Sequence, residues 1–180
     1  MLNQPQQKYH SLLILLHWVM AFAFAVMFVS SEVMEESPND LAFILHSSLG
    51  LSLLLLFIFR FCISIFSRKT INHTQFAKWE QLAFKIIKLG FYVLMFLTPL
   101  TGWLMTHFEP EVQPSQLWNI VPWPMLFSPE ASHEQFEVLE EIHEFCANSL
   151  ILLIFLHIGA FLKHRLIDDV DLLKNITFRN

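Results

Sequence analysis

Four long apolar runs constrain this chain more than any other feature of its sequence. The runs cover about residues 12–30, 41–66, 82–105 and 142–166. A helix needs about 20 apolar residues to cross a bilayer, and it satisfies its own backbone hydrogen bonds in lipid. The sequence therefore predicts an all-α integral membrane protein: a single four-helix bundle over residues 1–180, with an outer segment at 107–141 between the third and fourth spans.

The composition excludes the main soluble classes. Charged residues make up 15% of the 180 residues and hydrophobic residues 54%, whereas soluble domains carry roughly 25% charged residues. So little charge cannot cover a cytoplasmic globule, and it argues against a disordered chain or a nucleic-acid binder with a basic face. The first run is too long for a signal peptide and has no small-x-small cleavage site before Glu32, so we interpret it as a retained span.

The charged residues divide between the two sides of the membrane. The loop after the first span, together with the segment that leads into the fourth, holds twelve carboxylates and no Lys or Arg. All eleven Lys and Arg residues lie on the other side, opposed by four carboxylates, so that side carries +7 and the outer side −12. Cytoplasmic loops carry the excess of Lys and Arg. Both termini are therefore expected in the cytoplasm, and a bacterial inner membrane is the simplest location.

Four His residues lie inside the predicted spans, where ionisable groups are costly and usually face the interior of the bundle. His46 and His143 lie near the outer surface, whereas His17 and His157 lie several residues above the inner one. His143 and His157 are 14 residues apart, close to four turns, so they share one helix face about 21 Å apart along the axis. Depth thus sorts the four residues into two pairs, each drawn from two helices.

Two layers of two imidazoles are what bis-His ligation of two b-type haems requires, because a flat macrocycle takes one axial nitrogen from each side. Zinc is the rival metal, but a structural zinc site needs four clustered ligands and a catalytic site three. Hydrogen-bonded packing residues are the alternative without any cofactor. The pattern favours two haem b groups, with His17 and His157 on the inner iron and His46 and His143 on the outer iron.

Three more residues are candidates near the inner layer. Arg60 follows His46 by 14 residues on the same face; we expect it to pair with an inner haem propionate, and a membrane anchor is the alternative. His164 lies one heptad after His157 at the inner boundary, where a quinone headgroup could accept its hydrogen bond. Lys88 lies at the same level, with a snorkelling anchor as its default role. Solvated or interfacial side chains are expected for the remaining His residues His10, His73, His107 and His133.

Several motifs then point to a family: Leu-His-Trp at 16–18, His-Ser-Ser-Leu-Gly at 46–50 with Arg60, Pro-Leu-Thr-Gly at 99–102, and His143 with His157 and His164. In these motifs the chain resembles the bacterial cytochrome b-561 family, four-helix di-haem cytochromes of the inner membrane, over nearly its whole length. The resemblance implies the same two His pairs as haem ligands and electron exchange with ubiquinone at the cytoplasmic side. The family often has a His where this chain has Lys88, which implies a quinone region there with a poorer proton shuttle.

The resemblance also implies that some members oxidise superoxide at the outer side and pass its electron to quinone. An anion is steered by positive potential, yet the outer side of this chain has twelve carboxylates and no Lys or Arg. Its field favours a cation or a basic protein, such as a small cytochrome c, as the periplasmic partner. The sequence leaves open whether the chain is an enzyme of the superoxide:ubiquinone type or an electron carrier alone, and whether it forms a homodimer.

Two other functions remain open at this point. The chain could be a haem b anchor and relay subunit of a larger dehydrogenase, such as a hydrogenase, and a stoichiometric partner would then co-purify with it. It could also be a His-lined transporter without haem, which would have no reduced-minus-oxidised visible spectrum. The direction of electron flow depends on the surroundings of each haem, which residue spacing does not define.

Overall fold

A computed structural model describes residues 11–36, 40–67, 76–108, 116–126, 132–171 and 177. Within them the chain forms α1 (Ser11–Glu36), α2 (Asp40–Ser67), α3 (Lys78–Met105), β1 (Gln116–Leu117), β2 (Val121–Pro122) and α4 (His133–Leu166). The four helices are all long and apolar enough to cross a membrane. The predicted helical fold with four spans is therefore confirmed.

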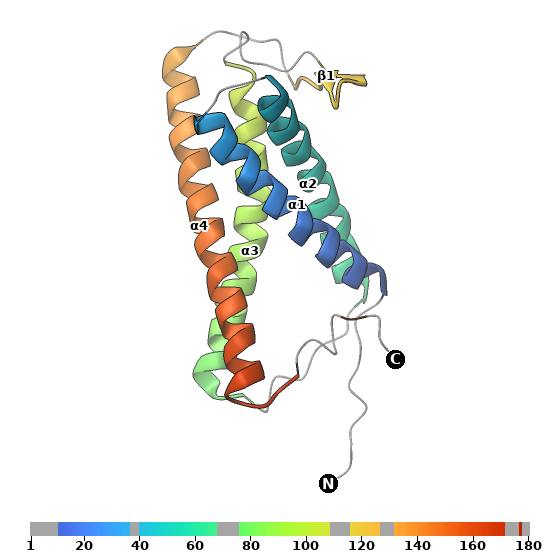
Figure 1. The fold of residues 1–180 in the computed structure, drawn as a ribbon, viewed down its shortest axis with the longest axis vertical. Helices are drawn as coiled ribbons and strands as arrows, with labels where there is room; N and C mark the ends of the chain where they lie inside the picture. The colour runs from blue at the N-terminus through green and yellow to red at the C-terminus, as the bar shows by residue number, and fades with distance from the viewer. Residues whose placement is uncertain are drawn as a thin grey trace.

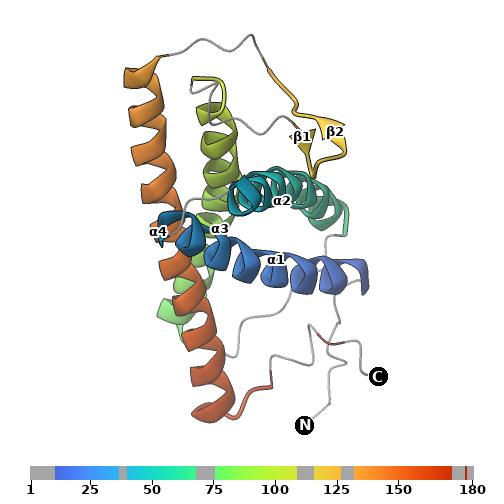
Figure 2. The same cartoon turned by 45° about the horizontal axis from the view of Figure 1, so that its top comes forward.

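The helices form two packed pairs (Figures 1 and 2). Helix α3 lies along α4, α1 packs against α2, and α2 also contacts α3 and so joins the two pairs. Over the described residues, no Cα atom of α4 comes within 8 Å of α1 or α2. Helix α4 thus faces the α1–α2 pair across a space that side chains have to bridge.

Each end of the bundle has its own charge. The acidic end consists of the end of α1, the start of α2, the end of α3, the β1–β2 hairpin and the start of α4. Its exposed carboxylates are Glu32, Glu35, Glu36, Glu134, Glu137, Glu140, Glu141 and Glu144. The opposite ends of the same helices form the basic end.

The fourth helix is longer than its apolar run. It begins at His133, nine residues before the predicted start at 142. Residues 133–141 contain no Gly or Pro, and Glu134 lies in the first turn, where a negative charge interacts favourably with the helix dipole. Hydropathy marks only the lipid-facing part of such a helix, so the acidic extension lay outside the predicted span.

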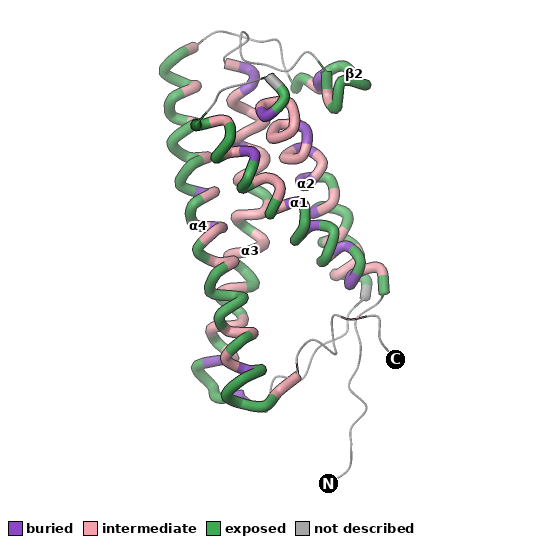
Figure 3. The backbone as a smooth tube through the Cα atoms, in the orientation of Figure 1, coloured by how far each residue is buried: buried purple, intermediate pink, exposed green. Residues whose placement is uncertain are grey.

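Apolar side chains are buried where α1 meets α2 and, in a second cluster, where Leu51 and Leu54 of α2 meet Trp123 after β2. Met20 and Ala23 of α1 pack against Leu53 and Phe57 of α2, whereas residues coloured as exposed occur along all four helices (Figure 3). The exposed set includes large apolar residues such as Phe155, which is 69% exposed. An apolar surface of this extent is expected where a protein contacts lipid.

The β1–β2 hairpin is fixed to the acidic end by hydrogen bonds. The backbone N–H of Trp118 donates to Ser48 Oγ (3.0 Å), and the Trp123 indole donates to Thr106 Oγ1 (3.2 Å). His107 is fully buried: its Nδ1 donates to a backbone carbonyl of α3 and its Nε2 accepts the Leu126 N–H (2.9 Å). The prediction of a solvated or interfacial His107 is wrong, because the side chain is fully buried and bonds Leu126 in the segment after β2.

Candidate functional site

The structure brings the four His residues of the spans together in two pairs. His46 of α2 faces His143 of α4 near the acidic end, with ring centroids 6.3 Å apart and ring planes at 77°. His17 of α1 faces His157 of α4 nearer the basic end, with a separation of 6.4 Å and an angle of 72°. In each pair the imidazoles extend from helices whose backbones do not touch. The rings therefore meet in the space between α4 and the α1–α2 pair.

His143 is oriented by helix α3. Its Nδ1 lies 2.8 Å from the carbonyl oxygen of Thr98 and 3.3 Å from Thr101 Oγ1. A carbonyl oxygen only accepts, so Nδ1 carries the hydrogen and Nε2 keeps its lone pair free. Gly102 lies one turn after Thr98, and a Cβ atom there would be only 2.9 Å from Cε1 of His143. The missing side chain allows the imidazole to reach the Thr98 carbonyl.

His46 is oriented by helix α1 in a similar way. Ser30 donates its hydroxyl hydrogen to the carbonyl of Met27 (2.8 Å). Its oxygen, 3.2 Å from Nδ1 of His46, is then left to accept a hydrogen bond from the imidazole. Both imidazoles at the acidic end therefore donate through Nδ1 and retain Nε2 as a free ligand atom. A metal-ligating His usually donates its other ring N–H to an oxygen acceptor in this way.

The pair nearer the basic end has different surroundings. The His17 ring contacts Trp18, and the His157 ring meets Phe91 edge-on at 5.6 Å. Neither imidazole makes a side-chain hydrogen bond in the described part of the chain. Arg60 of α2 is close enough to His17 to interact with it electrostatically. This pair is thus held by aromatic packing and lies beside a positive charge.

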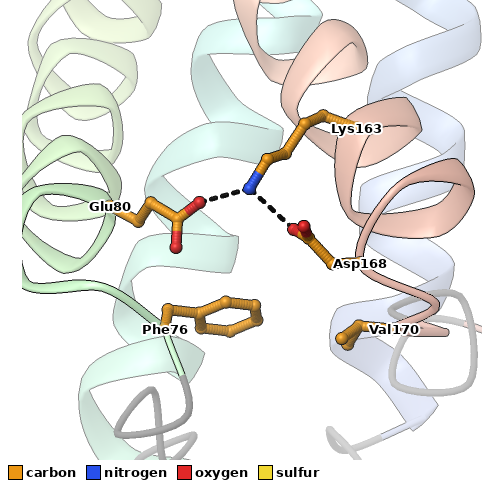
Figure 4. Close-up of a pocket in the computed structure, with 5 residues that line it drawn as sticks. All are labelled: Phe76, Glu80, Lys163, Asp168 and Val170. Carbon is orange, nitrogen blue, oxygen red and sulfur yellow. Dashed lines mark hydrogen bonds and ion pairs between the residues drawn. The ribbon is translucent and has the colours of Figure 1, made fainter.

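A cluster of charged residues joins the start of α3 to the end of α4 at the basic end (Figure 4). Lys163 forms ion pairs with Glu80 and Asp168, the latter at 2.7 Å. Asp168 also accepts a hydrogen bond from Nδ1 of His164 (2.6 Å). The Lys163 hydrogen bond holds the pKa of Asp168 below its ordinary value, with a smaller contribution from His164. A cavity of about 330 Å³ opens beside this cluster.

His164 is almost entirely buried, at 3% exposure. Its ring lies against Phe76 and Phe84, at 4.7 and 5.5 Å between centroids. Glu80, His164 and Asp168 have ligand atoms within 4.8 Å of one another, a spacing that could hold a metal ion. The Lys163 ammonium already bonds both carboxylates and supplies the positive charge that such an ion would bring.

The structure does not bring Lys88 to His164. The Lys88 ammonium lies 5.7 Å from the ring centroid of Tyr92. Tyr92 lines an apolar groove of about 400 Å³ between α2 and α3, together with Phe57, Ile58, Phe61, Val93, Phe96 and Leu97. The two residues expected in one quinone region therefore have different surroundings.

Of the other His residues, His133 is exposed and pairs with Glu137 (3.2 Å), as expected for a solvated side chain. His10 and His73 lie outside the described residues.

Sequence reasoning missed the residues that orient the imidazoles, namely Ser30, Thr98 and Gly102, and the partners of His164, namely Asp168, Lys163 and Glu80. Only the Pro-Leu-Thr-Gly motif at 99–102 gave a signal for any of them.

A bundle of four apolar helices with two facing imidazole pairs between them defines a membrane protein suited to hold a metal cofactor between its helices. A family model of prokaryotic cytochrome b561 matches residues 8–179, and the chain therefore belongs to the prokaryotic cytochrome b561 family. No curated protein matches the chain. Membership makes it a multi-pass bacterial membrane protein that binds haem b and transfers electrons, and it confirms the family that the motifs had indicated.

The His pairs fit a haem iron. Two imidazoles on opposite sides of one metal, each with a metal–nitrogen bond of about 2.0 Å, have ring centroids about 6.3 Å apart. The two pairs lie at 6.3 and 6.4 Å. Thr98, whose carbonyl faces His143, also has a buried Oγ1 without a hydrogen-bond partner in the described part of the chain, and a bound group or water is one of the partners that such an atom can have.

Proposed function

We propose that the chain holds two haem b groups and transfers electrons between a quinone at its basic end and a periplasmic partner at its acidic end. His46 and His143 would hold one haem, and His17 and His157 the other. The observation that carries the proposal is the presence of two imidazole pairs, each at the ring separation of a bis-His metal site. The haem supplies one-electron redox chemistry, and the chain supplies ligands, orientation and a low-dielectric environment.

The orientation follows from charge. We place the basic end and both termini in the cytoplasm of a bacterial inner membrane, because all eleven Lys and Arg residues lie on that side. Arg60, beside His17, is the residue proposed to pair with a propionate of the inner haem. A charge-assisted bond of this kind would neutralise a carboxylate that is costly to bury.

Ubiquinone is the proposed redox partner at the cytoplasmic side, with His164 rather than Lys88 as its polar contact. His164 has its Nδ1 fixed by Asp168, which leaves Nε2 as the atom available to a quinone oxygen, and Phe76 and Phe84 would flank a planar ring. Lys88 lies over Tyr92 beside the α2–α3 groove, and a role as an anchor at the membrane surface explains its position there.

His164→Gln should strongly slow haem reduction by quinol, whereas Lys88→Gln should leave that rate nearly unchanged. The reverse result would place the quinone in the α2–α3 groove.

The periplasmic partner is proposed to be a cation or a basic protein. Eight exposed carboxylates surround the acidic end in the described residues, and a field of this sign speeds association with positive partners and slows it with anions. Electron exchange with a basic cytochrome c should therefore slow as salt is added. An exchange rate that is independent of salt would contradict this choice of partner.

Haem content tests the proposal directly. The purified protein should show a reduced-minus-oxidised b-type spectrum and about two haems per chain. Ala at His17 or His157 should remove about one haem, and Ala at His46 or His143 should remove the other. His133→Ala is the matched control, because His133 is exposed and pairs with Glu137 rather than with another imidazole; it should keep both haems.

Two outcomes would contradict the proposal. Retention of both haems in any of the four ligand variants would refute the ligand assignment. A protein without any haem spectrum would favour a His-lined transporter, and a stoichiometric dehydrogenase partner in the purified sample would favour the relay-subunit function.

A further inference from the structure

The two His pairs differ in their hydrogen bonding. At the acidic end both imidazoles donate through Nδ1, His143 to the Thr98 carbonyl and His46 to Ser30 Oγ. In the described part of the chain, neither His17 nor His157 makes such a bond. The acidic-end pair therefore has two oriented second-shell acceptors, and the basic-end pair has none.

A hydrogen bond from the distal N–H makes an imidazole a more basic ligand. A more basic ligand donates more electron density to the metal and stabilises its oxidised state over its reduced state. Second-shell hydrogen bonding is one of the means by which a protein sets a haem reduction potential. The hydrogen bonds of His46 and His143 thus lower the potential of the acidic-end site relative to the other.

Fixed charges act in the same direction. The Glu144 carboxylate interacts electrostatically with His143, and a nearby negative charge stabilises the more positive, oxidised iron. The Arg60 guanidinium interacts electrostatically with His17, and a nearby positive charge stabilises the reduced iron. Arg60 lies within the apolar run of α2, where a charge is weakly screened, whereas Glu144 is exposed, so its charge is screened more strongly.

We infer that the chain itself sets the acidic-end haem site at a lower reduction potential than the basic-end site, through Ser30, the Thr98 carbonyl and the opposed charges of Glu144 and Arg60. This inference rests on the proposed function, since it requires one haem at each His pair. One electron that passes from the acidic-end site to the basic-end site oxidises the first and reduces the second, and needs no proton or co-reactant. The favoured direction is then inward, from a periplasmic donor towards the quinone.

Ser30→Ala tests the hydrogen-bond contribution. It removes the hydroxyl acceptor of His46 with little change in volume, while the Met27 carbonyl stays as a second hydrogen-bond partner of that imidazole. The reduced-to-oxidised ratio of the acidic-end haem at a fixed potential should therefore rise by up to about fivefold. Ser31→Ala is the matched control, because Ser31 is half-buried and bonds a carbonyl of the same helix (2.8 Å) rather than an imidazole. Ser30→Thr keeps the hydroxyl and should restore the wild-type potential.

The measurement is a redox titration followed by visible absorbance. The single-haem variants His157→Ala and His46→Ala identify which transition belongs to which site. The expected result is a lower potential for the acidic-end haem, an upward shift of that haem alone in Ser30→Ala, and a downward shift of the basic-end haem alone in Arg60→Gln. Equal potentials, the reverse order, or an unmoved acidic-end potential in Ser30→Ala would overturn the inference. Loss of neither or of both haems in the single-His variants would instead refute the proposed function.

Discussion

Replacing Gly102 with Ala would place a methyl group against the imidazole of His143. A Cβ atom at position 102 would lie 2.9 Å from Cε1 and 3.1 Å from Nδ1 of that ring. Non-bonded carbon atoms prefer a separation of about 3.5–4.0 Å, so the ring would have to move by about 0.6 Å or more. Nδ1 lies 2.8 Å from the Thr98 carbonyl, and such a movement would weaken that bond and shift Nε2 relative to His46.

The expected consequence is a specific loss of cofactor. Loss of an outer-shell partner of a ligating His costs about 10–100-fold in metal affinity, and overpacking adds roughly 1–3 kcal/mol of strain. Gly102→Ala should therefore lose most of the haem at the acidic end and keep the haem at the basic end. Haem per chain and the visible spectrum of the purified protein would measure the loss.

Two other glycines provide controls. A Cβ atom at Gly90 would lie 2.8 Å from Cδ1 of Leu153, the flexible end of a side chain that is not a proposed ligand, whereas a Cβ atom at Gly159 would meet nothing within 4 Å. Gly90→Ala and Gly159→Ala should both keep two haems, and the latter should gain about 1 kcal/mol of helix stability. If Gly102→Ala also kept two haems with unchanged affinity, the reasoning about His143 would be refuted.

Three further predictions concern stability and partners. The pKa of Asp168 is held below its ordinary value by Lys163. The ion pairs of Asp168 therefore stabilise the fold fully above that ordinary value, and this stabilisation is lost as the pH falls through the lowered pKa. The thermal unfolding temperature should fall more steeply between pH 7 and pH 3 in wild type than in Asp168→Asn. His107→Ala should lower the free energy of unfolding by about 3 kcal/mol, because it removes a buried side chain and leaves the Leu126 N–H without its acceptor. Unfolding in detergent measures this change. A change within 0.5 kcal/mol, about the effect of an ordinary surface substitution, would contradict the prediction. Quinone reduction by superoxide should be slow and should not fall as salt is added, because the acidic end repels an anion; a fast rate that falls steeply with salt would contradict the charge argument.

The number and character of the helices could be predicted from the sequence, because hydropathy and helix length are local properties. The ends of the helices extend beyond the predicted spans for the same reason. Helix α4 continues from its apolar run through nine acidic-end residues to His133, and α3 begins at Lys78, where Glu80 accepts the Ala77 N–H (3.0 Å). Polar residues that extend a helix into water leave no hydropathy signal.

The candidate site was predictable only in part. The depth of a His in its span follows from its position in the sequence, so the residues facing one another could be paired by depth. Their orientation depends on contacts between helices: the Thr98 carbonyl and Ser30 Oγ have no sequence signature as acceptors for His143 and His46. His107 shows the same limit, because the backbone that bonds it lies 19 residues away, at Leu126 in the segment after β2.

The proposed haems would also complete the fold. Helix α4 packs on α3, and no described Cα atom of α4 lies within 8 Å of α1 or α2, so the imidazole pairs are side-chain contacts that reach from α4 to the other half of the bundle. A metal bound by one His from each side would join α4 to α1 at His17–His157 and to α2 at His46–His143. Binding free energy at such a site is also folding free energy. The same four residues would then serve electron transfer and the assembly of the bundle, which explains why ionisable side chains are placed so deep in apolar helices despite their cost in lipid.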